Sequence, residues 1–291
     1  MQIKLKNIFK IIRNYCEFFL FLAINFILKI FSFSLTSNIG GFIVRNLGAY
    51  TKYFSIIKTN LKILNLPEEE ITKLAKKNLD QTGRVFFEFF NLKKFNWGNI
   101  KVKNHHFLQE LKKYNGSCIF LSAHLGNWEI TRNYLLQSGF TLHSVYRHAN
   151  NSLIDSYIQN NRKEKNAFFY KKGSESAKNM ILALKKNHHL ALLVDQRDSS
   201  GPLIDFMGKK CFATDGYANL ALKYKTKICP IYSRRINNDN FEIVIEKPLE
   251  FADFSELKSK SIIEMVHENY FKKWILENPT QWLWVHQRWR I

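Results

Sequence analysis

The second half of this 291-residue chain alternates short apolar runs with longer stretches of helical periodicity. Apolar runs of strand length lie at 118–121, 190–194, 228–232 and 241–245. The pattern predicts helices at 153–166, 174–186, 216–225 and 255–277. Strands that alternate with helices form a mostly parallel sheet with both faces covered. We therefore expect an α/β fold with a mostly parallel central sheet flanked by helices.

The first 35 residues are basic and then apolar. Four positive charges precede a charge-free run at 18–28, and Lys29 separates this run from a second one at 30–35. A helix that spans a bilayer needs about 20 mostly apolar residues, so the segment is short for that role. A tilted anchor, whose Lys29 reaches the interface, and a helix lying along the membrane surface both stay open. We expect an N-terminal membrane-anchoring helix in residues 1–36 and one catalytic domain in 37–291.

The stretch from 37 to 95 is predicted to be helical, with a break and a new helix start at 65–70. There Pro67 precedes three glutamates, and acids in a first turn favour the helix dipole.

The chain is strongly basic, with 44 Lys and Arg against 24 Asp and Glu and a net charge of +20. Such a charge favours a polyanionic partner, such as an acidic membrane, a phosphorylated lipid or an acidic protein. The basic residues are scattered, as on an ordinary solvated surface, and no nucleic-acid-binding motif is present, so we expect no nucleic-acid partner. The four cysteines have neither metal-ligand nor disulfide-framework spacing, which indicates a reducing compartment.

His124 follows the apolar run at 118–121, at the strand end where open α/β sheets bind ligands. The turn at Gly126 and Asn127 leads into a helix with Glu129 in its first turn. We expect the Glu129 carboxylate to fold back onto the His124 ring, fix its tautomer and raise its basicity. The pair would then act as a general base. A core histidine and a helix-dipole carboxylate are the structural alternatives.

The surrounding motifs extend this prediction over most of the chain. Residues 122–129, Ser-Ala-His-Leu-Gly-Asn-Trp-Glu, resemble the His-x4-acid block of the bacterial lipid A late acyltransferases, within the glycerolipid acyltransferase superfamily. Further segments resemble that family in order: 146–151 with Arg147, Arg162, 194–196 with Asp195, 201–216, 229–235 and 281–289. The sequence departs from the family at Met207, where an aromatic is usual, and in a shorter tail.

The resemblance implies an acyltransferase at the cytoplasmic face of the bacterial inner membrane. It would transfer a fatty acyl chain from acyl carrier protein to a hydroxyl of a phosphorylated, Kdo-bearing lipid A precursor. No metal or cofactor is expected, because the donor is the carrier-protein thioester, with acyl-CoA as an alternative. No P-loop, dinucleotide fingerprint, Gly-x-Ser-x-Gly elbow or His-Glu-x-x-His motif is present in the sequence.

Four further residues are expected to bind substrate. Amides at the Gly126-Asn127 turn, or Arg147, would hold the developing oxyanion, although Arg147 equally fits a docking or plain surface residue. Arg162 would bind phosphate through its planar guanidinium. Asp195, at another predicted strand end, would support the base or bind the sugar.

Two rivals stay open at this stage. One is an acyltransferase for a lysophospholipid or another glycolipid, and the other is a non-enzymatic basic protein that binds membrane or nucleic acid. Acyl chain length, the acylated position and the oligomeric state are not predicted.

Overall fold

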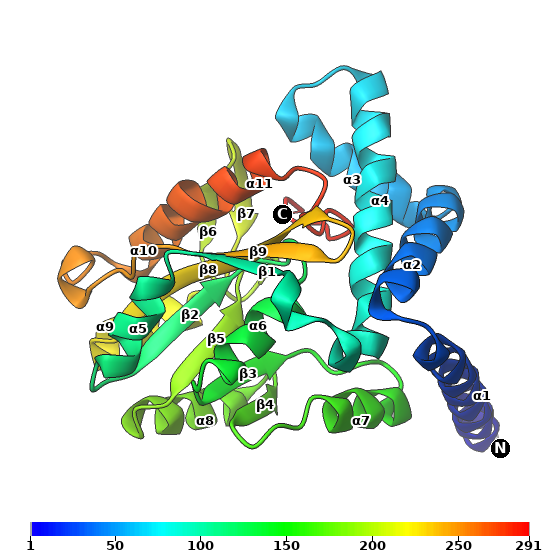
Figure 1. The fold of residues 1–291 in the computed structure, drawn as a ribbon, viewed down its shortest axis with the longest axis horizontal. Coiled ribbons are helices and arrows are strands. Elements are labelled where there is room, and N and C mark those ends of the chain that lie inside the picture. Colours follow the sequence, from blue (N-terminus) through cyan, green and yellow to red (C-terminus); the bar gives the residue numbers. More distant parts are fainter. Residues whose placement is uncertain (1, 291) are drawn as a thin grey trace.

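The computed structural model describes the backbone of residues 2–290 and the side chains of residues 8–290. A central sheet of seven strands has the order β1-β9-β8-β2-β5-β3-β4 (Figure 1). Its strands are β1 Ile100–Lys103, β2 Cys118–Ser122, β3 Leu142–Tyr146, β4 Ala167–Lys171, β5 His189–Leu193, β8 Lys227–Asn237 and β9 Asn240–Ile245. A separate antiparallel hairpin joins β6 Leu203–Phe206 and β7 Lys209–Phe212.

The prediction of a mostly parallel sheet is confirmed, because every neighbouring pair in the central sheet is parallel except β8 and β9. That pair is a hairpin whose turn uses Asn238 with a φ of 37°, and so short a connection permits only antiparallel strands. The edge strands β1 and β4 are only partly buried and lack the continuous apolar run of a central strand, so the sequence pattern did not reveal them.

The helices surround this sheet and extend it toward the N-terminus. They are α1 Gln2–Ile30, α2 Phe33–Leu47, α3 Lys52–Leu61, α4 Glu68–Asn91, α5 His105–Lys113, α6 Trp128–Gln137, α7 Ser152–Asn161, α8 Ser174–Lys185, α9 Gly216–Tyr224, α10 Ser259–Val266 and α11 Lys273–Glu277. The expected break before α4 is confirmed at Pro67. The expected helix at 255–277 begins only at Ser259, and a π-helical turn, His267–Lys272, separates α10 from α11.

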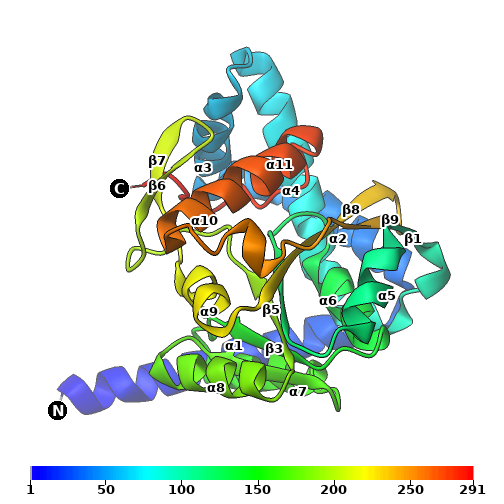
Figure 2. The same ribbon diagram turned by 90° about the vertical axis from the view of Figure 1, so that its left-hand side faces the viewer.

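Side chains alternate between the two faces of the sheet, as strand geometry requires. On β2, Ile119 and Leu121 join a core beneath α8, α9, α10 and α11, whereas Cys118 and Phe120 join a second core beneath α5 and α6 (Figure 2). Both cores exclude water, and each fully buried large apolar side chain stabilises the fold by roughly 1.5–3 kcal/mol. The strand β2 is therefore packed from both faces along its whole length.

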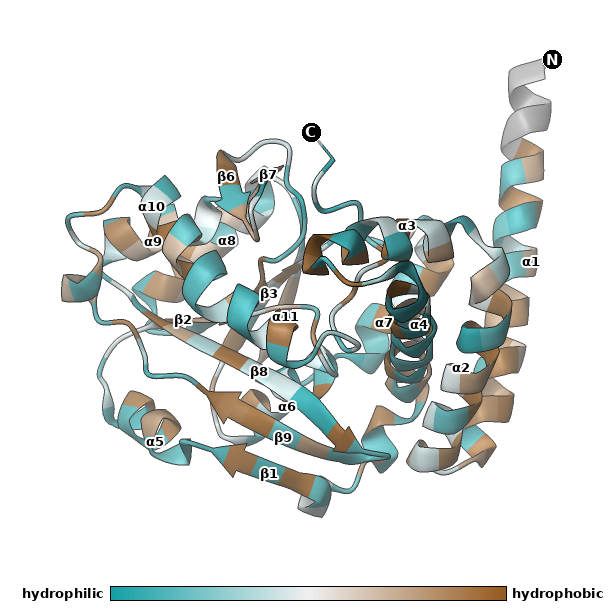
Figure 3. Ribbon diagram, turned by 90° about the horizontal axis from the view of Figure 1, so that it is seen from above, coloured by the Kyte–Doolittle hydropathy of each residue, from teal (hydrophilic) through white to brown (hydrophobic). Residues whose placement is uncertain are grey.

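The N-terminal helix α1 projects from this body (Figure 3). Within the described residues, Ile8–Ile30 is one helix of 23 residues that is long and apolar enough to cross a membrane. Phe9, Phe19 and Phe26 are exposed on it. The Asn25 amide donates to the Tyr157 hydroxyl of α7, which ties α1 to the sheet domain. The expected domain boundary at residue 36 falls inside α2, which packs along α4.

Candidate active site

The site is built where two parallel strands of the sheet end side by side. Because β2 and β5 are neighbours in parallel register, the residues after them meet at one edge. The Val194 amide donates to the Ser122 carbonyl at 3.2 Å, so the pairing continues one step beyond the strands. His124 and Asp195 follow these positions and face each other.

Asp195 holds His124 through two bonds. Its Oδ2 accepts from the backbone amide of His124 at 2.9 Å, and its Oδ1 lies 2.8 Å from the ring Nδ1. Burial by itself would raise the pKa of the Asp195 carboxyl, but the His124 ring and amide and the Trp282 indole lower it to about 2. The carboxylate is therefore ionised and can only accept hydrogen bonds, so Nδ1 carries the proton and Nε2 of the neutral ring is the free base.

Three further side chains surround the His124 ring and its carboxylate partner. The Trp282 indole donates to Oδ2 of Asp195 at 2.7 Å, and the ring of Trp128 lies edge-on to the imidazole at 4.9 Å. The Gln196 amide nitrogen lies 3.5 Å from Nε2. The side chain of His124 has 17% of its surface exposed to solvent, whereas the side chain of Asp195 has 2% exposed. The His124 ring is therefore partly open to solvent, whereas the supporting carboxylate is buried behind it.

The expected contact between Glu129 and His124 is not formed in this structure. The Glu129 carboxylate bonds to Arg162 and lies 3.4 Å from Nε of Arg132. Consecutive residues of an α-helix point about 100° apart, so Trp128, which faces the His124 ring, turns Glu129 away from it. The prediction that Glu129 orients His124 is wrong in its geometry, and Asp195 occupies that position.

Arg162, which we expected to bind phosphate, makes its contacts within the protein, and its role toward phosphate stays a prediction. It caps the end of α7, pairs with Glu129 and lies over the rings of Phe89 and Phe169. Arg132 also lies over the ring of Phe169. Burial lowers the pKa of the Arg132 guanidinium, although the nearby negative charge of Glu129 acts to raise it. Arg162 and Arg132 therefore share the Glu129 carboxylate in one ion cluster that joins α6 to α7.

The turn after His124 is fixed by close backbone contacts. Gly126 adopts a φ of 59°, and a Cβ at this position would lie 2.0 Å from the Ser233 carbonyl oxygen. Its amide donates to the Gln281 carbonyl at 3.1 Å, so this N–H is not free for an oxyanion. The Leu283 amide donates to the His124 carbonyl at 2.9 Å. The segment around Trp282, near the C-terminus, therefore forms backbone hydrogen bonds with the turn after His124.

The Asn127 side chain is fully engaged within the protein, and the role expected of its backbone amide at the oxyanion stays a prediction. Its oxygen accepts from the amides of Glu129 and Ile130 and caps α6, and its nitrogen donates to Glu88 at 2.7 Å. Glu88 is fully buried on α4 and also binds Arg235 at 2.5 Å. Glu88 was not predictable from the sequence, because no short motif distinguishes it within its helix.

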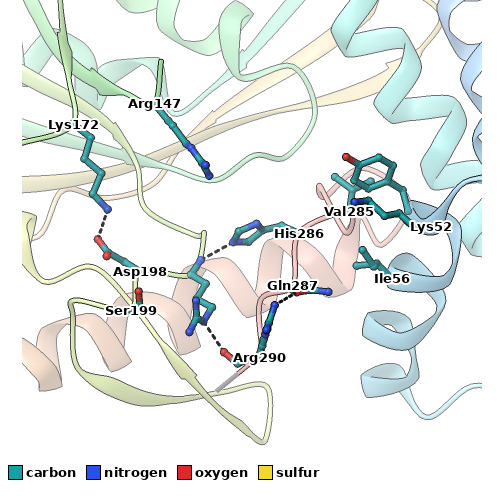
Figure 4. A pocket seen from close by; sticks show the side chains of 12 residues that line it. Lys52, Ile56, Arg147, Lys172, Asp198, Ser199, Val285, His286, Gln287 and Arg290 are labelled. Carbon is teal, nitrogen blue, oxygen red and sulfur yellow. Dashed lines mark hydrogen bonds and ion pairs between the residues drawn. The ribbon is translucent and has the colours of Figure 1, made fainter. Parts of the chain in front are cut away.

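Arg147 lines an open cavity of about 610 Å³ (Figure 4). Its side chain is exposed. Glu129, Arg132 and Arg162 line a second cavity, of about 850 Å³. His124 is not among the residues that line either cavity. Within residues 8–290, no three His, Cys, Asp or Glu side chains gather as metal ligands.

Comparisons with known proteins complete this description. The family profile of bacterial lipid A biosynthesis acyltransferases matches residues 4–291. Among solved structures, the 1-acyl-sn-glycerophosphate (LPA) acyltransferase PlsC from Thermotoga maritima is 13% identical, with a TM-score of 0.40 over 86% of this chain and 98% of that one. Comparison with curated proteins gives no match. Because the profile spans nearly the whole sequence, the chain belongs to the bacterial lipid A biosynthesis acyltransferase family and is an acyltransferase.

Proposed function

We propose that this acyltransferase moves a fatty acyl chain from the thioester of acyl carrier protein to a hydroxyl of a phosphorylated, Kdo-bearing lipid A precursor. The family supports the lipid A acceptor. The net charge of +20 would steer an acidic carrier protein and a phosphorylated lipid toward the enzyme. The apolar helix α1 supports work at the membrane, which we place at the cytoplasmic face of the inner membrane.

The proposed chemistry rests on the bond between His124 and Asp195. With Nδ1 protonated and bound to the carboxylate, Nε2 takes the proton of the acceptor hydroxyl as its oxygen attacks the thioester carbonyl. Asp195 stabilises the imidazolium that forms. The protonated ring then returns its proton to the departing thiolate, which leaves ester and free thiol as products. No covalent acyl-enzyme is required.

The developing oxyanion needs donors near the reacting carbonyl. We assign these to the start of α6, where the helix dipole adds positive potential, and to the Gln196 side-chain amide beside Nε2. Glu129 takes a positioning role in this proposal. Its bonds with Arg162 and Arg132 anchor the first turn of α6, which carries Trp128 against the His124 ring.

The direct test is acyl transfer by the purified full chain in detergent micelles. Labelled acyl carrier protein and acyl-CoA are offered as separate donors, with a Kdo-lipid A precursor and a lysophospholipid as separate acceptors. We expect an ester on the Kdo-lipid A precursor by mass spectrometry, with acyl carrier protein as the better donor. Its rate should fall as salt rises, because screening weakens steering between charged partners. Acylation of the lysophospholipid alone would contradict the proposed acceptor.

A further inference from the structure

The cavity of about 610 Å³ that Arg147 lines is basic. Five of its lining residues carry a positive charge, and one carries a negative charge. The five basic residues are Lys52, Arg147, Lys172, Arg197 and Arg290. The acid, Asp198, is already bonded to Lys172 at 2.8 Å and to the Ser200 hydroxyl at 2.7 Å. The cavity therefore holds a large excess of positive charge at its surface.

These cations come from separate segments that meet around one space (Figure 4). Lys52 belongs to α3, Arg147 follows β3, Lys172 follows β4, and Arg197 follows β5. Arg290 lies in the C-terminal segment and is tied to Arg197, whose Nε donates to its carbonyl at 2.6 Å. Like charges gathered by the fold repel each other unless an anion lies between them. Their convergence indicates a site for an anion.

This cavity adjoins the proposed reaction centre through two short stretches of chain. Arg197 follows Asp195 by two residues, so their Cα atoms are at most about 7 Å apart. The Arg197 amide donates to Nε2 of His286 at 3.0 Å, and His286 lies three residues after Leu283, which binds the His124 carbonyl. The cavity is therefore lined by the same two stretches of chain that carry Asp195 and contact the His124 backbone.

The surroundings of the cavity favour a lipid-borne anion. Three side chains near the cavity are exposed: Leu47 at the end of α2, Tyr50 in the short 3-10 helix that follows, and Tyr53 in the first turn of α3. Tyr53 also lines the cavity. The C-terminal segment that lines it lies on the same side of the molecule as the projecting part of α1 (Figures 2 and 3). If α1 enters a membrane, the cavity therefore lies at the level of lipid headgroups.

We propose that this cavity binds a phosphate group of the acceptor glycolipid and thereby sets the acceptor hydroxyl against His124. Guanidinium groups match phosphate oxygens with paired hydrogen bonds, and Arg147 and Arg290 each present an exposed guanidinium to the cavity. The proposal rests on the proposed function for its acceptor. In this proposal the basic cavity binds the phosphate in place of Arg162, which already contacts Glu129.

The test compares a phosphorylated precursor with the same precursor after enzymatic dephosphorylation, both in mixed micelles. The double variant Arg147→Gln/Arg290→Gln is matched by Lys185→Gln/Lys186→Gln, which removes the same charge from the exposed end of α8. We expect the wild type and the α8 variant to prefer the phosphorylated acceptor. In the cavity variant, the ratio of kcat/KM values for the two acceptors should fall about 10- to 100-fold. An unchanged ratio in a fully active cavity variant would overturn the inference and leave the proposed function standing.

The donor also carries a phosphate in its phosphopantetheine arm, so the experiment must distinguish binding of the acceptor phosphate from binding of the donor phosphate. If the cavity variant raised KM for acyl carrier protein equally with both acceptors, the phosphate would belong to the donor and our assignment would be wrong. If the wild type acylated no acceptor, the proposed function would fail on its own. Retention of radiolabelled phosphorylated precursor by resin-bound protein would then decide the site, with loss in the cavity variant supporting it and equal retention overturning it.

Discussion

The imidazole Nδ1 of His124 lies 2.8 Å from the Oδ1 of Asp195, across two strands that are neighbours in the sheet. The two residues are 71 positions apart in the chain. The carboxylate also binds the His124 amide and the Trp282 indole, so it holds both the ring and its backbone. This arrangement, rather than a contact with Glu129, orients the proposed base.

Replacing Asp195 with Asn should lower kcat strongly. The amide cannot stabilise the imidazolium and can donate to Nδ1, which would leave the basic nitrogen of His124 on the wrong side. We expect a loss of about 10²- to 10⁴-fold in acyl transfer, measured with saturating donor and acceptor. Asp205→Asn, on exposed β6, is the matched control and should keep full activity. A fully active Asp195→Asn variant would show that His124 needs no carboxylate.

Glu129 and Arg162 should behave as one structural unit. Glu129→Gln leaves the guanidinium groups of Arg162 and Arg132 without their carboxylate and should lower the free energy of unfolding by roughly 3–5 kcal/mol. Arg162→Met should cost less, because Glu129 keeps Arg132 at 3.4 Å. The double variant should cost less than the sum of the two, with a coupling of about 1–3 kcal/mol in urea unfolding. The same cycle on the exposed pair Asp205 and Lys210 should give a coupling of at most about 1 kcal/mol. Additive losses at Glu129 and Arg162 would contradict the ion pair.

Gly126→Ala should destabilise the protein severely. The new Cβ would lie 2.0 Å from the Ser233 carbonyl oxygen, and the positive φ adds strain. We expect a loss above about 4 kcal/mol, seen as a lower urea midpoint or failure to fold. Gly139→Ala has a φ of 90° but no atom within 4 Å, so it should cost only about 1–2 kcal/mol. Equal losses at the two glycines would exclude the close approach to Ser233 as the cause.

Acid should remove the stability that Asp195 contributes. The pKa of its carboxyl is about 2 in the folded protein against an ordinary value of 3.8, so its contribution is present above 3.8 and is lost as pH falls through about 2. The difference corresponds to about 2 kcal/mol. Unfolding free energies measured between pH 5 and pH 2 should therefore decline more steeply for wild type than for Asp195→Asn. Identical pH dependence of stability in the two proteins would show that Asp195 does not contribute to the loss of stability in acid.

The positions of the reactive residues were predictable because strand ends can be recognised locally. His124 follows a continuous apolar run, and Asp195 follows another, which places both at the same edge of a parallel sheet. A supporting role for Asp195 was one of two roles expected for it, and the observed contact agrees with that role. The mostly parallel sheet and the start of α4 at Pro67 were predictable for the same local reasons.

The pairing between side chains was not predictable, because it depends on strand order and helix rotation. That β2 lies beside β5 is a property of the whole topology, and no short motif encodes it. Glu129 is near His124 in sequence, but packing of Trp128 against the imidazole turns the carboxylate toward Arg162. The basic cavity likewise draws its residues from several separate segments and becomes visible only after folding.

The most direct test of this account is the turnover number of His124→Ala in acyl transfer from acyl carrier protein to the Kdo-lipid A precursor. His106→Ala, on the exposed face of α5, is the matched control. We predict that kcat falls by about 10²-fold or more in His124→Ala, with an unchanged urea midpoint and KM values within about threefold of wild type. A folded His124→Ala enzyme that keeps the wild-type kcat would contradict the assignment of His124 as the general base.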